Sequence, residues 1–185
     1  MTTKLSIKLT SWTLIVLLLC PAVSRASGDI LTGGRLIAAT PFDLKVFSTG
    51  VFSNENILQN TQPASSIEEL FTVAKSFRYL HVSKKLWQTP EETEALGTGD
   101  CADKSVWLYA HLKQNGYQNV RLVIGKYRSI DTIFHVWVVY TDDQGKSYLL
   151  DPAIQKKVWE AACFEEGYYK AFYSYDGASR YRYDS

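Results

Sequence analysis

The hydrophobic pattern between residues 101 and 151 changes its period halfway along, and this change constrains the fold more than any other feature of the chain. From Cys101 to Asn115 apolar residues recur at helical spacing, and Gly116 is well placed to end a helix in the left-handed conformation. The segments 120–125, 134–140 and 146–150 are instead rich in β-branched and aromatic residues, which is typical of strands. Residues 142–145 favour a turn that pairs the last two strands as a hairpin. A helix followed by antiparallel strands predicts an α+β fold.

Two further helices are expected upstream of Cys101. Ser65 or Ser66 can cap a helix over about residues 67–87, with one apolar face buried. Thr89 and Pro90 have the pattern of a helix cap and first helical residue. The tail after residue 166 is crowded with tyrosines, which indicates an edge strand with its rings lying on the core, or alternatively an aromatic surface facing a substrate.

The first 26 residues have the pattern of a secretory signal peptide. Lys4 and Lys8 precede an apolar run at residues 12–19, and small residues around Ala26 fit a cleavage site. The run is shorter than the roughly 20 residues of a membrane span, so we expect no stable span in the mature form, with a retained anchor as the alternative. We therefore expect a periplasmic or secreted protein with an irregular segment at 27–64 and one domain at 65–185.

Charge and cysteine content limit the possible partners. Lys and Arg number 20 against 19 Asp and Glu, and no basic stripe is present, which argues against nucleic-acid binding. Removal of the signal would leave Cys101 and Cys163, and two cysteines in an exported chain could form a disulfide. A Cys101–Cys163 bridge is therefore a structural alternative to any chemical role of Cys101.

Three residues in this order can activate a thiol: Cys101, His135 and Asp151. Cys101 would begin a helix, where unpaired backbone N–H groups and the helix dipole stabilise a thiolate. An imidazole can take the thiol proton and return it, and a carboxylate can fix the imidazole tautomer. His135 shares a strand face with Trp137 and Val139, so it would meet the thiol if that face packed on the Cys101 helix.

Each residue also has an ordinary structural interpretation. Cys101 could be a small buried hydrophobe, and His135 a hydrogen-bonded core residue. Asp151 precedes a proline and could simply begin a turn. Asp100 and Asp103 could serve only to cap the helix.

The segments 87–93, 99–103, 135–138 and 150–152 together resemble the transglutaminase-like superfamily, and most closely its bacterial exported cysteine peptidases. The resemblance implies a papain-like fold with Cys101 as nucleophile, His135 as base and acid, and Asp151 as orienting carboxylate. It implies hydrolysis of a peptide or amide bond, in a protein or peptide substrate, through an acyl-enzyme. Acyl transfer to an amine and a non-catalytic binding module on the same fold are the alternatives.

The resemblance also bears on cofactors. In some members of this group an acidic pair flanking the cysteine binds calcium, and a glutamate often follows the cysteine directly. Here Asp100 is present, but Ala102 follows Cys101. Because calcium requires several oxygen ligands, this departure argues against a calcium site, and no cofactor is expected.

Overall fold

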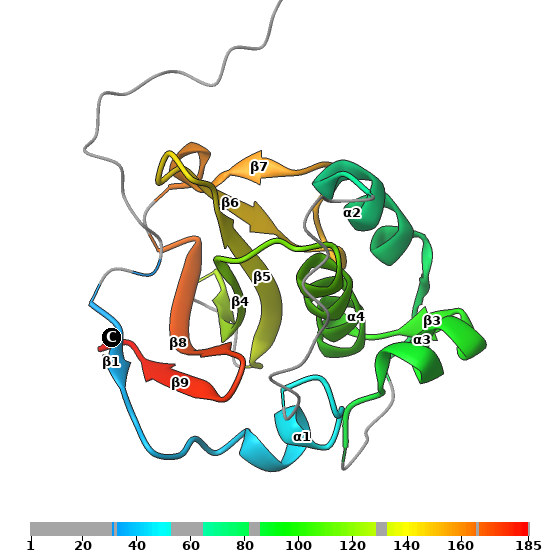
Figure 1. The fold of residues 1–185 in the computed structure, drawn as a ribbon, viewed down its shortest axis with the longest axis horizontal. Helices are drawn as coiled ribbons and strands as arrows, with labels where there is room; N and C mark the ends of the chain where they lie inside the picture. The colour runs from blue at the N-terminus through cyan, green and yellow to red at the C-terminus, as the bar shows by residue number, and fades with distance from the viewer. Residues whose placement is uncertain are drawn as a thin grey trace, which may run out of the picture.

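A seven-stranded antiparallel sheet organises the chain, with helices against one of its faces (Figure 1). The computed structural model describes residue 31 and residues 33–52, 65–81, 86–128, 133–165 and 167–184. The expected signal peptide at residues 1–26 lies outside the described residues. The strand order is β1-β9-β8-β4-β5-β6-β7. The strands are β1 (Arg35–Leu36), β4 (Val120–Tyr127), β5 (His135–Thr141), β6 (Ser147–Leu150), β7 (Trp159–Glu160), β8 (Tyr169–Asp176) and β9 (Ser179–Arg182).

The helices precede most of the sheet in the chain, so the α+β prediction is confirmed. They are α1 (Asp43–Phe47), α2 (Ile67–Ser76), α3 (Pro90–Leu96) and α4 (Cys101–Gln114), with a short 3-10 helix at Ala161–Cys163. Helix α4 packs on β4 and β5, while α2 and α3 pack on α4. None of the helices in the described part of the chain is both long and apolar enough to cross a membrane.

Each face of the sheet carries its own apolar core because side chains alternate along a strand. The first core joins α4 to the sheet, with Val106, Tyr109, Leu112, Leu122, Ile124, Val136, Val138 and Leu150 fully or almost fully buried. The second lies on the opposite face and contains Leu31, Val123, Trp137, Val139, Leu149, Tyr169 and Tyr183. The sheet is therefore buried on both sides of its centre, which fixes the register of β4, β5 and β6.

The expected start of α3 and the expected start and end of α4 are confirmed. Thr89 caps α3 and Pro90 is its first residue. Helix α4 begins at Cys101, and Gly116 follows its C-terminal end at a φ of 86°. The positive φ allows the chain to turn toward β4, a conformation that glycine adopts without steric cost.

The expected helix over residues 67–87 is wrong in length. Helix α2 is capped by Ser66 but ends at Ser76, because Phe77 adopts an extended ψ of 132°. Arg78 and Tyr79 then form β2, which pairs in parallel with β3 (Thr98–Gly99) just before α4. Pairing with β3 overrides the helical spacing of the apolar residues, and Leu80 is consequently 40 % exposed.

The expectation of an edge strand in the tyrosine-rich tail is also wrong. Strand β8 lies between β4 and β9, well inside the sheet. Its Tyr175 is fully buried and Tyr169 is buried in the second core. An aromatic-rich sequence does not reveal which strand it will pair with, and here the tail returns to pair with β4.

Candidate active site

The N-terminus of α4 is held by reciprocal hydrogen bonds around Cys101. Asp100 Oδ1 accepts hydrogen bonds from the backbone N–H groups of Ala102 at 2.9 Å and Asp103 at 3.2 Å. Asp103 Oδ2 in turn accepts from the Asp100 N–H at 3.1 Å, which completes a capping box. The capping interpretation of Asp100 and Asp103 is therefore confirmed, and the box fixes the orientation of the first turn that carries Cys101.

Asp103 also ties the upstream segment to this turn. Its Oδ1 accepts a hydrogen bond of 2.8 Å from the Gln88 N–H, and both residues are buried. A β-carbon on Gly99 would lie 2.7 Å from Asp103 Cβ, so glycine is required here for the close approach of strand and helix. Gln88 thus lies beside the start of α4, a placement that the sequence alone could not supply.

His135 approaches Cys101 from the end of β5. Val136 and Val138 pack against α4, whereas Trp137 and Val139 lie in the second core. The condition considered for contact between His135 and Cys101, that the face with Trp137 and Val139 packs on α4, is therefore not the one the structure uses. His135 can nevertheless reach Cys101 because it is the first residue of β5, where a side chain can extend past the end of the sheet.

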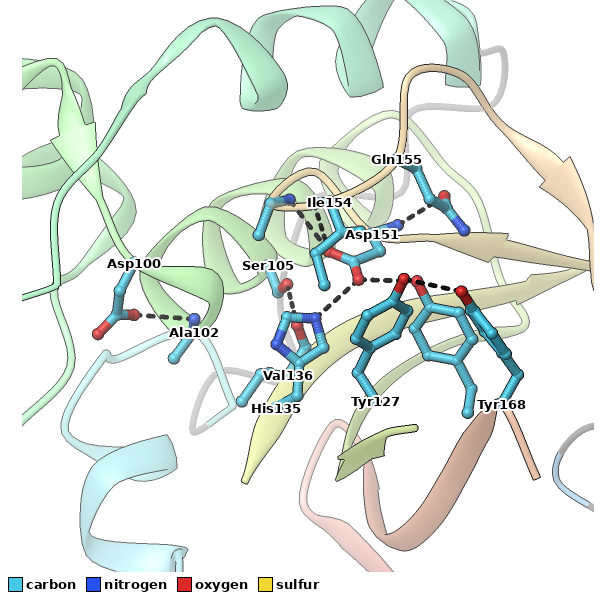
Figure 2. A network of polar contacts seen from close by, with 12 residues as sticks. Asp100, Ala102, Ser105, Tyr127, His135, Val136, Asp151, Ile154, Gln155 and Tyr168 are labelled. Carbon is cyan, nitrogen blue, oxygen red and sulfur yellow. Dashed lines mark hydrogen bonds and ion pairs between the residues drawn. The ribbon is translucent and has the colours of Figure 1, made fainter. Parts of the chain in front are cut away.

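A hydrogen bond between α4 and β5 fixes this approach. Ser105 lies one helical turn after Cys101, and its hydroxyl donates a 3.0 Å bond to the carbonyl of Val136. Both Ser105 and Val136 are buried, so the contact is shielded from water. Figure 2 shows His135 between the first turn of α4 and Asp151.

Asp151 holds the imidazole from its other side. His135 Nε2 lies 2.7 Å from Asp151 Oδ2, and this carboxylate is fully buried. The contact leaves Nδ1 as the ring nitrogen for Cys101, whose side chain also makes a hydrogen bond with His135. Cys101, His135 and Asp151 are therefore brought together in a chain of polar contacts.

Asp151 is itself fixed by four further groups. Its Oδ1 accepts bonds from the Ala153 and Ile154 N–H groups at 3.0 and 3.2 Å, as expected for an aspartate that begins a turn. Its Oδ2 accepts a 2.9 Å bond from the Tyr169 hydroxyl, and Gln155 Oε1 accepts a bond from the Asp151 N–H at 3.0 Å. A buried carboxylate with these donors is stabilised as an anion without moving from the imidazole.

The electrostatic surroundings favour a protonated imidazole. Burial by itself lowers the pKa of His135, but the hydrogen bonds and charges of Asp151 and Cys101 outweigh it and raise the pKa to about 10. Both ring nitrogens of an imidazolium are donors, one toward the carboxylate and one toward the sulfur. Cys101 is a free thiol, so the alternative of a Cys101–Cys163 disulfide is wrong.

Several aromatic residues of the site were missed by the sequence analysis. The Tyr127 ring lies 5.9 Å from the His135 ring and 5.1 Å from the Tyr169 ring, and Trp137 lies 5.2 Å from Tyr169. Burial and the charge of Asp151 raise the pKa of Tyr169, so its hydroxyl remains a donor. No local signal identifies these rings, because the pairing of β8 with β4 brings Tyr169 to the site.

Tyr79 lies on the opposite side of the site, on β2. Its position pairs with Gly99, two residues before Cys101. Burial, followed by the negative charges of Cys101, Asp100 and Asp151, raises the pKa of its phenol. The phenol is therefore close to the reacting groups and stays protonated, although Tyr79 is about half exposed.

The acidic residues beside Cys101 serve as helix caps. Both oxygens of Asp103 and Oδ1 of Asp100 accept hydrogen bonds from backbone N–H groups, whereas Asp100 Oδ2 lies 3.7 Å from His81 Nδ1. Ala102 offers no side-chain oxygen. In the described part of the chain, no three His, Cys, Asp or Glu side chains gather as a metal cluster would require. Hydrogen bonds from backbone N–H groups account for three of the four carboxylate oxygens of Asp100 and Asp103.

The fold of the chain is similar to that of solved LapG structures, an α+β arrangement that agrees with the fold implied by the motifs. The chain is similar to three structures of LapG from Legionella pneumophila. One matches at 20% identity and a TM-score of 0.51 over 59% of this chain and 61% of LapG. A calcium-bound form matches at 20% identity and a TM-score of 0.54, over 64% of this chain and 70% of LapG. An EGTA-treated form matches at 15% identity and a TM-score of 0.57, over 80% of this chain and 89% of LapG.

No family model matches the sequence, and no curated protein matches it. At these identities the structural similarity establishes the fold of the chain. In the first match, the chain spans 61% of the LapG chain, which is less than two thirds of its length.

Proposed function

We propose that this protein is a cysteine hydrolase that cleaves a peptide or amide bond outside the cytoplasm. The observation that carries the proposal is the position of His135 between two partners. Its Nε2 is hydrogen-bonded to buried Asp151, and its ring also makes a hydrogen bond with the Cys101 side chain. In this arrangement one imidazole can exchange a proton with the thiol while the carboxylate holds it in place. The similarity of fold to LapG, a transglutaminase-like cysteine protease, supports the same reaction class.

The proposed reaction has two steps. The Cys101 sulfur attacks the carbonyl carbon and forms a C–S bond, and His135 gives its Nδ1 proton to the nitrogen as the C–N bond breaks. His135 then removes a proton from water, whose oxygen attacks the thioester and releases the acid. The Cys101 N–H, at the first turn of α4, is the expected donor to the oxyanion.

Calcium has no part in this proposal. Although one of the similar LapG structures is calcium-bound, the acidic side chains around Cys101 are bonded to the helix backbone here. Export is proposed from the signal-like pattern of residues 1–26.

The direct test uses the purified full chain and a library of internally quenched peptides. We expect wild-type protein to cleave members of the library and to form a thioester at Cys101 that mass spectrometry can detect. Cys101→Ala should fold normally by circular dichroism and lack both properties, whereas Asp143→Asn on an exposed turn should retain both. Equal cleavage by Cys101→Ala would contradict the proposal.

The same experiment distinguishes hydrolysis from acyl transfer. A primary amine added to the reaction competes with water for the thioester. Hydrolysis predicts that free acid remains the main product, whereas a transglutaminase would incorporate the amine into most of it.

A further inference from the structure

Arg128 follows β4 in a backbone conformation that is unusual for a residue with a side chain. Its φ is 66°, and it is the one residue other than glycine with a positive φ among those described. A non-glycine residue in this region carries a conformational cost and persists only where surrounding contacts hold it there. Here the Arg128 N–H donates a 2.7 Å hydrogen bond to the carbonyl of Tyr168.

The guanidinium of Arg128 is held against two aromatic rings. Its central carbon lies 5.1 Å from the centre of the Tyr127 ring and 5.7 Å from that of Tyr168. Its Nη2 donates a 3.3 Å bond to the Tyr168 hydroxyl, which lies 3.2 Å from the Tyr127 hydroxyl. Figure 2 shows Tyr127 and Tyr168 side by side next to His135 and Asp151. The cation is therefore pre-positioned, because stacked and hydrogen-bonded guanidinium groups lose little freedom on binding.

This cation is not neutralised within the described part of the chain. Arg128 is exposed, and no ion pair joins it to a carboxylate among the residues that the structure describes. Uncompensated positive charge of this kind attracts an anion to the end of β4 and β8.

The geometry determines which part of a substrate would meet Arg128. In the proposed reaction His135 protonates the leaving nitrogen, so the fragment after the cleaved bond lies on the side of His135. The Tyr127 ring is 5.9 Å from the His135 ring and 5.1 Å from the Arg128 guanidinium carbon. The guanidinium is thus within about 11 Å of the imidazole, a span that an extended peptide covers in about three residues.

We propose that Arg128 forms a carboxylate-binding subsite for the leaving side of the substrate, within about three residues of the cleaved bond. The proposal rests on the proposed function of Cys101 and His135. A planar guanidinium matches a carboxylate through paired N–H···O bonds. The carboxylate can come from an acidic side chain or from the C-terminus of a short peptide.

The test uses three alkylating probes that need no knowledge of the natural substrate. Each is an iodoacetyl peptide, so the Cys101 sulfur forms a bond to its methylene carbon and iodide leaves, while the peptide extends away on the leaving side. Iodoacetyl-Gly-Glu-amide carries an acidic side chain, iodoacetyl-Gly-Gln with a free C-terminus carries a terminal carboxylate, and iodoacetyl-Gly-Gln-amide is neutral. Second-order rates of Cys101 labelling are compared between wild type and Arg128→Asn.

Asparagine removes the charge and tolerates the positive φ, so this variant should fold. We expect wild-type Cys101 to react about three to ten times faster with at least one anionic probe than with the neutral probe. This preference should disappear in Arg128→Asn and weaken in 0.5 M salt, because the guanidinium is exposed. Unsubstituted iodoacetamide should label both proteins at the same rate, because it does not reach Arg128.

The outcomes separate the subsite from the function on which it rests. The faster anionic probe identifies the source of the carboxylate, as acidic side chain or C-terminus. Equal rates for all three probes, or a preference that Arg128→Asn retains, would overturn the subsite even if iodoacetamide labels Cys101 rapidly. A Cys101 that reacts no faster than an ordinary thiol with any reagent would overturn both proposals.

Discussion

Replacing Asp151 with asparagine changes one atom at the centre of the site, and the surrounding bonds determine how the new amide must sit. The backbone N–H groups of Ala153 and Ile154 both donate to Oδ1, so the amide oxygen must occupy that position. The amide NH₂ then occupies the Oδ2 position, where His135 Nε2 and the Tyr169 hydroxyl now find a donor instead of an acceptor.

The imidazole responds by changing its tautomer. To accept from the amide, His135 Nε2 must lose its proton, so the neutral ring carries its proton on Nδ1, the nitrogen that faces Cys101. That nitrogen can no longer take a proton from the thiol. Without the carboxylate, burial is opposed by Cys101 alone, so the pKa of His135 falls.

The magnitude follows from the pKa and from the tautomer. The difference between 6.5 and about 10 for His135 corresponds to roughly 5 kcal/mol at 1.36 kcal/mol per unit. An equivalent substitution in a serine triad lowers kcat about 10⁴-fold. We therefore expect Asp151→Asn to acylate Cys101 about 10³ to 10⁴ times more slowly, while polar mismatch costs about 1–3 kcal/mol of unfolding free energy.

Two assays measure this effect on folded protein. The burst of p-nitrophenol from p-nitrophenyl acetate gives the acylation rate, and ¹⁵N spectra give the protonation of each ring nitrogen. The chain has three histidines, so His135→Ala assigns the signal. At pH 8 the wild-type ring should be doubly protonated and the Asp151→Asn ring neutral, with Asp143→Asn matching wild type. A variant that keeps a doubly protonated ring and the wild-type burst would refute the reasoning.

Four further predictions follow from the same contacts. Tyr169→Phe keeps the Asp151 carboxylate but removes one hydrogen-bond donor to it. The acylation rate should fall only a few-fold, and urea titrations should show a loss of about 1 kcal/mol of unfolding free energy. A fall in the acylation rate as large as that of Asp151→Asn would contradict this prediction. Gly125→Ala should destabilise the fold by about 3 kcal/mol or more, because the new methyl would lie 1.9 Å from the Lys170 carbonyl; unchanged urea unfolding would show that the strands can separate. Because the pKa of His135 is higher in the folded than in the unfolded chain, its stabilisation is complete below about pH 6.5 and lost as pH rises through about 10, so wild type should lose more stability than His135→Ala between these limits. EGTA should leave the acylation rate unchanged, since the carboxylate of Asp100 already binds backbone N–H groups, and a loss restored by calcium would contradict this assignment.

Local signals in the sequence were sufficient to predict the framework of the site. The cap at Asp100, the helix that starts at Cys101 and the hairpin that ends at Asp151 depend on neighbouring residues, and these features appear at the expected positions. Their order along the chain, with a cysteine, a histidine and an aspartate at element ends, also predicted which residues come together. Capping and turn formation involve few residues, so the sequence records them directly.

Features that depend on distant pairing could not be predicted in this way. The sequence defines two faces of β5 but does not state which face α4 will cover, and α4 covers the face of Val136 and Val138. Tyr169 joins the site only because β8 pairs with β4. Arg128 looks like an ordinary surface residue until its backbone conformation and its neighbour Tyr168 are known.

The most direct test of the account is the reactivity of Cys101 in the full chain, measured with iodoacetamide between pH 5 and 10 and located by mass spectrometry. Activation by His135 predicts that folded wild-type Cys101 is labelled about ten-fold or more faster at pH 7 than Cys101 in His135→Ala or in urea. Cys101→Ser should show no labelling at this position. Equal labelling rates in the folded wild type and in His135→Ala would contradict the claim that these residues form a catalytic pair.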